Sequence, residues 1–109
     1  MPLPDIEPVG GSYNNLGNLE TASGNLIEAN DYFQLAKRIY INGGDATATS
    51  LARVHLNFAR MYLLSSQLSE AEEAVRLAEN IIRRTGAEAT LMAPYVLLVT
   101  IALLHKIRD

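Results

Sequence analysis

Hydrophobic and polar positions alternate along this chain with the period of an α-helix. Within residues 26–41 the large and small apolar residues recur three or four positions apart, which places them on one face of a helix. The same spacing predicts helices over residues 13–23, 46–65 and 70–85, and a fifth within 88–109. The inward-facing positions expected for the middle three helices are Leu26, Ala29, Phe33, Ala36 and Tyr40, then Val54, Phe58, Met61, Tyr62 and Leu64, then Ala71, Ala74, Val75, Ala78, Ile81 and Ile82.

Stretches rich in glycine, proline and serine separate these helices. Three prolines followed by Gly10 and Gly11 predict an extended leader over residues 1–11, because proline removes a backbone donor. Glycines after the predicted helices supply the left-handed residue that often ends a helix. The residues expected to cap the following helices are Ser12, Asp45 and Ser69.

The second half of the chain repeats the first, with matching residues always the same number of positions apart. Gly17 and Ala59 are one such pair and define this offset. At this offset a small residue, Gly17, matches a small residue, and Phe33 falls on Val75, so a large residue matches a large one. So many matches at one offset indicate an internal repeat. The further pairs are Gly24 with Ser66, Leu26 with Leu68, Glu28 with Glu70, Ala29 with Ala71, Ala36 with Ala78, and Gly44 with Gly86.

Each copy resembles a tetratricopeptide repeat (TPR). Leu16-Gly17 and Phe58-Ala59 look like the family's large–small pair in the first helix. The alanines that match between the copies, Ala29 with Ala71 and Ala36 with Ala78, resemble the alanines of the family's second helix. The resemblance implies an all-α fold, a short right-handed α-solenoid of two TPR-like helical hairpins plus a fifth C-terminal helix. Glu20 stands where the family usually has tyrosine, and both copies lack the usual closing proline.

The repeat also sets the expected limits of the domain. We expect repeat one over about residues 12–44, repeat two over about 45–86, and a partial third repeat or capping helix over 87–109. The long period, from Gly17 to Ala59, is similar to that of the long-period arrays of kinesin light chains and of fungal and bacterial multidomain signalling proteins. One alternative is that the chain is a truncated fragment of such a multidomain signalling protein.

The TPR resemblance implies non-catalytic protein–protein interaction, with a peptide or partner helix bound in a concave groove. In that family the groove is lined by the first helix of each repeat. Asn18 and Asn57 match the asparagines of a known carboxylate clamp, but the clamp's basic positions hold Asn14, Tyr95 and Val99. The groove residues implied here are Asn14, Asn18, Arg53, Asn57 and Arg60, with Thr21 and Leu56 beside them.

The last helix is the most apolar part of the chain. Thr90–Leu104 carries no charge, yet its fifteen residues fall short of the ~20 that span a bilayer. A membrane-associated protein anchored by this segment is therefore a second alternative. We expect instead that the helix packs on residues 70–85 and forms a homodimer interface through Tyr95, Leu98 and Ala102.

Composition narrows the chemistry. The net charge of −3 gives no basic face for nucleic acid, and the chain has no cysteine for a thiolate metal site or nucleophile. His55 and His105 are far apart, so we expect no metal, no cofactor and no catalytic site. A deep pocket that gathers His55, Glu20 and a serine would favour a small helical enzyme instead. The N-terminus shows no secretory signal, which indicates an intracellular, cytoplasmic protein.

Overall fold

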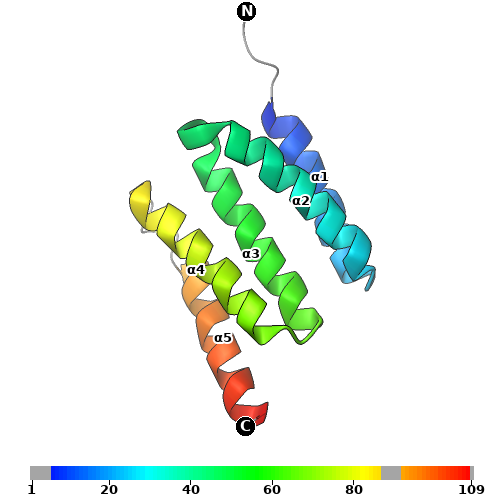
Figure 1. The fold of residues 1–109 in the computed structure, drawn as a ribbon, viewed down its shortest axis with the longest axis vertical. Helices are drawn as coiled ribbons and strands as arrows, with labels where there is room; N and C mark the ends of the chain where they lie inside the picture. Colours follow the sequence, from blue (N-terminus) through cyan, green and yellow to red (C-terminus); the bar gives the residue numbers. More distant parts are fainter. Residues whose placement is uncertain (1–5, 87–91, 109) are drawn as a thin grey trace, which may run out of the picture.

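The computed structural model describes residues 6–86 and 92–108, and within these ranges it contains five α-helices and no strand (Figure 1). α1 packs against α2 and α3 against α4, and short turns join each pair into a helical hairpin. The predicted all-α class is confirmed. The helices are α1 (Ile6–Ala22), α2 (Leu26–Asn42), α3 (Ala48–Leu64), α4 (Leu68–Arg84) and α5 (Met92–Arg108), with a 3-10 helix, η1 (Gly44–Thr47), before α3.

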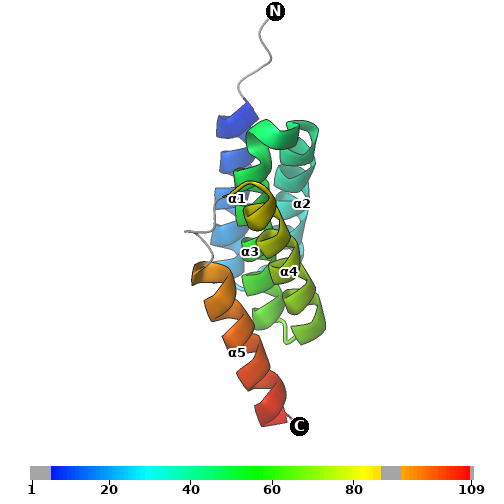
Figure 2. The ribbon, with the colours of Figure 1, turned by 90° about the vertical axis from the view of Figure 1, so that its left-hand side faces the viewer.

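The helices form two layers that meet at α3. Figure 2 shows α1 and α5 on one side of the molecule and α2 and α4 on the other, with α3 between them. α3 contacts all four other α-helices. The molecule therefore has two distinct faces, an α1/α3/α5 face and an α2/α3/α4 face.

The two hairpins repeat at the offset seen in the sequence. α1 and α3 begin at Ile6 and Ala48, and α2 and α4 begin at Leu26 and Leu68. Both pairs of first residues are separated by the same number of positions as Gly17 and Ala59. The turns correspond as well, because Gly24 (φ +81°) and Ser66 (φ +61°) both adopt the left-handed conformation after the first helix of their hairpin. The resemblance to long-period arrays in particular stays an expectation.

The core lies between the hairpins and follows most of the predicted stripes. Phe33 is fully buried, and its ring lies 5.4 Å from that of Phe58, which joins the α2 and α3 stripes. Leu64 was expected inside, but its side chain is 64% exposed. It stands at the last position of α3, next to the turn that leads into α4. The predicted residues found buried are Ala29, Phe33, Ala36, Tyr40, Val54, Phe58, Met61, Ala71, Ala74, Val75, Ala78 and Ile82.

The first helix begins earlier than predicted. Residues 6–11 belong to α1, so the expected extended leader is wrong there, while residues 1–5 lie outside the described ranges. Pro8 stands in the first turn, where a backbone N–H has no intrahelical acceptor and its loss costs little. Gly10 packs against α2, since a Cβ there would lie 2.5 Å from Tyr40 Cζ. Glycine at this position therefore permits close helix packing.

The predicted caps are also wrong. Ser12 lies inside α1, where its hydroxyl donates to the Pro8 carbonyl at 2.8 Å. Asp45 lies in η1 and pairs with Arg84 at 2.9 Å, and Ser69 is the second residue of α4. Thr47 and Gln67 occupy the cap positions of α3 and α4 without a side-chain cap hydrogen bond.

Candidate functional site

A buried polar pair joins α1 to α3 on the α1/α3/α5 face. Asn57 Nδ2 donates a hydrogen bond to Asn14 Oδ1 at 2.8 Å, and each residue is only 6% exposed. The Arg60 guanidinium donates to Asn57 Oδ1 at 3.0 Å. Because both polar atoms of the Asn57 amide are engaged, the amide couples the first repeat to an arginine of the second.

The five groove residues predicted from the sequence divide into two groups. The structure brings Asn14, Asn57 and Arg60 together, whereas Asn18 on α1 and Arg53 on α3 are exposed. Of the two neighbouring predictions, the Thr21 hydroxyl donates to the Gly17 carbonyl of its own helix at 2.7 Å, and Leu56 is 8% exposed. The exposed polar groups on this face that the prediction named are thus Asn18, Arg53 and Arg60.

The arrangement also bears on the carboxylate clamp implied by the resemblance. The Nδ2 group of Asn57, which such a clamp would use, is buried and already donates one of its two N–H bonds to Asn14. On α5, the Tyr95 hydroxyl accepts a hydrogen bond from Arg83, and Val99 is 58% exposed and apolar. Neither position of α5 supplies a cation.

α5 packs with one side and exposes the other. Ile101 and Leu97 are 2% and 8% exposed, and half-buried Leu98 packs against the same core. Of the residues predicted for a homodimer interface, Tyr95 contacts Arg83 of α4, Leu98 faces the core and Ala102 is exposed. The more exposed apolar residues define an α5 outer stripe at helical spacing: Val96, Val99, Leu103 and Ile107.

The membrane alternative rested on Thr90–Leu104. Residues 90 and 91 lie outside the described ranges, and the rest of the segment falls within α5. Among the described helices, none is long and apolar enough to cross a bilayer.

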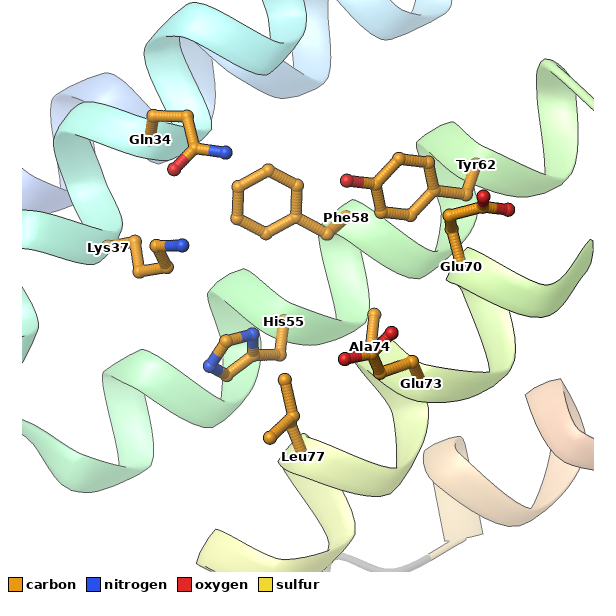
Figure 3. Close-up of a pocket in the computed structure, with 9 residues that line it drawn as sticks. All are labelled: Gln34, Lys37, His55, Phe58, Tyr62, Glu70, Glu73, Ala74 and Leu77. Carbon is orange, nitrogen blue, oxygen red and sulfur yellow. The ribbon is translucent and has the colours of Figure 1, made fainter. Parts of the chain in front are cut away.

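A pocket lies on the opposite, α2/α3/α4 face. Its volume is about 200 Å³, and its aromatic floor comes from α3 while its walls come from α2 and α4 (Figure 3). Sequence reasoning missed this pocket, because its parts are spread over three helices. The lining residues are Gln34, Lys37, His55, Phe58, Tyr62, Glu70, Glu73, Ala74 and Leu77.

His55 is the unusual residue of this pocket. Its side chain is 9% exposed, and burial, together with the nearby Lys37 charge, lowers the pKa of His55 from 6.5 to about 4. The imidazole is therefore neutral at physiological pH. Its ring packs on Phe58 at 6.4 Å, and the Lys37 ammonium lies 5.8 Å from the centre of the Phe58 ring.

The constellation that would favour an enzyme does not assemble around His55. Glu20 accepts a hydrogen bond from Asn25 at 2.9 Å in the α1–α2 turn, and no serine is among the residues that line the pocket. Within residues 6–86 and 92–108, no three histidine or acidic side chains are grouped so as to hold a metal ion.

Comparison with known proteins identifies the repeat. Searches of curated proteins and of solved structures found no match. The tetratricopeptide repeat family model matches residues 9–84, which span both hairpins. The match begins within α1 and ends at the last residue of α4, so it covers well over half of the chain. With its paired helices and its small-residue contacts, the chain belongs to the tetratricopeptide repeat family.

Proposed function

We propose that this chain is a non-catalytic scaffold that binds a peptide or a partner helix on its α1/α3/α5 face. TPR domains generally mediate protein–protein interaction, and that general role extends to this chain through its family. The observation that carries the proposal is the Asn14–Asn57–Arg60 network, which links the two repeats where the family places its groove.

The network gives each residue a distinct part in binding. Asn57, held by Asn14, accepts from Arg60 and so restricts the orientation of an exposed guanidinium. A restricted side chain loses less conformational entropy when it binds a ligand. Arg53 and Arg60 would then donate to carbonyl or carboxylate oxygens of the ligand, with Asn18 bonding its backbone.

Capture of partners from cell extract tests the proposal. The immobilised chain is compared with an Arg53→Ala/Arg60→Ala variant, and the partner retained by the native chain is then titrated by calorimetry. We expect the double variant to bind at least about tenfold more weakly, since hydrogen bonds to charged groups contribute about 1.5–3 kcal/mol.

Arg76→Ala is the matched control, because Arg76 is an exposed arginine of α4 that pairs with Glu72 and Glu79. It should bind as the native chain does. Equal loss of binding in both variants, or full binding by Arg53→Ala/Arg60→Ala, would contradict the proposed face.

A second contact surface is favoured by the α5 outer stripe. Val96, Val99, Leu103 and Ile107 are between 55% and 78% exposed. We propose that this stripe pairs with the same stripe of a second copy in an isologous dimer. The interface is then centred on the outer stripe, with Tyr95 and Ala102 at its edge. For the scaffold we propose an intracellular location, which is common among TPR proteins.

A further inference from the structure

Three charged side chains line the pocket on the α2/α3/α4 face. They are Glu70, Glu73 and Lys37, and within the described residues no ion pair involves any of them. Elsewhere on α4, by contrast, Glu72 and Glu79 form ion pairs with arginines of the same helix. Two carboxylates against one ammonium give the pocket a net negative charge, which favours a cationic occupant.

The two carboxylates come from neighbouring positions on one wall. Glu70 and Glu73 are three residues apart on α4, so their side chains lie on the same side of the helix. Figure 3 shows both beside the aromatic floor, with Lys37 and Gln34 across the pocket on α2. A planar group with several N–H donors can donate hydrogen bonds to two such carboxylates at the same time.

The two aromatic rings of the floor have different neighbours, Phe58 on the α2 side and Tyr62 on the α4 side. Lys37 already lies over Phe58, at 5.8 Å from the ring centre. The Tyr62 ring stacks on Phe58 with a centre-to-centre distance of 6.1 Å, and the described residues place no cation over it. Tyr62 is thus an available surface for a planar cation on the side of the pocket nearest the acidic wall.

His55 supplies an independent sign that the pocket takes a ligand. The side chain is 9% exposed and lines the pocket, and no hydrogen bond to its ring nitrogens is seen within the described residues. Since burial keeps the imidazole neutral, one nitrogen is an acceptor and the other a donor. Among the described residues no buried side-chain nitrogen or oxygen lacks a hydrogen-bond partner, so the unbonded ring nitrogens are open to the pocket, where a ligand can reach them.

We propose that this pocket is a second binding site, which takes the arginine side chain of a partner protein. The guanidinium stacks on Tyr62 and donates to Glu70 and Glu73, while His55, on the far side of Phe58, is left to bond the peptide backbone that carries the arginine. Arginine fits better than lysine, because its planar fork has five donors and stacks on aromatic rings. The pocket volume of about 200 Å³ is below the ~300–1,000 Å³ of typical small-molecule sites, which favours a single side chain.

This site is independent of the proposed groove. It uses α2, α4 and the opposite side of α3, and it shares no residue with the Asn14–Asn57–Arg60 network. A chain with Arg53→Ala/Arg60→Ala should therefore still bind arginine here, and a failure of either proposal leaves the other intact.

A peptide titration followed by NMR tests the site. The probes are the capped peptide acetyl-Gly-Gly-Arg-Gly-Gly-amide and its citrulline counterpart, which keeps the shape and loses the charge. We expect the arginine peptide to cause saturable shifts at the amides of Tyr62, Glu73 and Leu77 and at the His55 ring. The citrulline peptide should bind at least about tenfold more weakly.

Two pairs of substitutions on one helix separate the site from general electrostatics. Glu70→Gln/Glu73→Gln keeps the size of the exposed side chains and should weaken the arginine peptide by about tenfold or more. Glu72→Gln/Glu79→Gln removes the same charge from α4 outside the pocket and should change affinity by less than about twofold, because these carboxylates do not line the pocket and already pair with Arg76 and Arg83.

Three results would overturn the proposal. They are equal binding of the citrulline peptide, equal effects of the two double substitutions, and no saturable shift at these residues below about 10 mM peptide. Free arginine is the third probe. If it bound about tenfold more tightly than the peptide, the assignment to a partner protein would be wrong.

Discussion

Gly17 lies where α1 packs against α2, and its missing side chain makes room for Phe33. A Cβ at Gly17 would lie 2.4 Å from Phe33 Cε1, and Phe33 is fully buried. Gly17→Ala should therefore cost about 1–3 kcal/mol through overpacking, more than the ~1 kcal/mol that alanine gains in helix propensity. Urea unfolding measures the difference.

Gly11→Ala is the matched control in the same helix. A Cβ there meets only Tyr40 Oη at 3.9 Å, an ordinary contact, so the substitution should stabilise by up to about 1 kcal/mol. If both alanine variants were equally stable, the close packing of Gly17 would be refuted.

Ser66 is the one described residue other than glycine with a positive φ, at +61°. Its N–H bonds the Leu63 carbonyl and the Gln67 N–H bonds the Tyr62 carbonyl, the pattern that Gly24 and Asn25 form after α1. Because a left-handed conformation costs a residue with a side chain about 1–2 kcal/mol, Ser66→Gly should stabilise the fold by about 0.5–1 kcal/mol, after the added entropy of the unfolded chain.

Ser65→Gly provides the comparison. Ser65 has φ −92°, and its hydroxyl donates to the Tyr62 carbonyl at 3.1 Å. Glycine at this position removes that hydrogen bond and raises the conformational entropy of the unfolded chain. Both changes favour unfolding, so thermal unfolding should show a lower Tm than for the native chain. A lower Tm for Ser66→Gly as well would contradict the role assigned to the turn.

His55 makes the fold sensitive to acid. Its pKa is about 4 in the folded chain and near 6.5 in the unfolded one, so the stabilisation is complete above pH 6.5 and is lost as the pH falls towards 4. The difference corresponds to at most about 3 kcal/mol. Because the ring borders an open pocket, solvent screening reduces this to about 1–2 kcal/mol.

Comparison with His55→Gln isolates the contribution. Glu70, Glu73 and Lys37 also face the pocket, but both proteins carry them. Between pH 7 and 4.5, the free energy of unfolding should fall by about 1–2 kcal/mol less in the variant than in the native chain. Parallel pH profiles would show that His55 is not buried in its neutral form.

At the scale of the element, α5 is held mainly by its contacts with α4 and α3. Ile101 is 2% exposed in this contact, so Ile101→Ala should cost about 2–4 kcal/mol and loosen the helix. Val99→Ala removes a side chain that is 58% exposed and should change stability by less than about 0.5 kcal/mol. Hydrogen exchange at residues 97–104 measures the effect, and similar exchange in both variants would argue against this docking.

The helices themselves show which local signals are informative. The apolar stripe of residues 26–41 predicted α2 to within one residue, because four buried positions and the half-buried Leu26 repeat with one period. The start of α1 was missed because proline and glycine usually break helices. Here Pro8 stands where its missing N–H does no harm, and Gly10 is required by Tyr40 on another helix. A contact between helices is not visible in a local pattern.

At the scale of the whole molecule, the repeat explains what the sequence could predict. One constant offset relates the first hairpin to the second, so one recognised hairpin implied the next and the layered arrangement. The pocket could not be predicted in this way, because Lys37, His55 and Glu73 come from three helices and meet only after the hairpins stack. The Asn14–Asn57 pair is similar, since each asparagine appeared from the sequence as a separate polar residue on a groove.

Self-association is the property of the whole molecule that the α5 outer stripe predicts. Light scattering at micromolar concentration should give about twice the chain mass of 11.9 kDa. Val99→Glu/Leu103→Glu should give monomer, because the two residues are 58% and 56% exposed and a buried unpaired charge at their interface costs several kcal/mol. Ile27→Glu is the control, since Ile27 is 78% exposed on α2, away from α5, and should leave the dimer intact. A mass near 11.9 kDa for the native chain over the whole micromolar range would exclude the dimer and leave the stripe to a different partner.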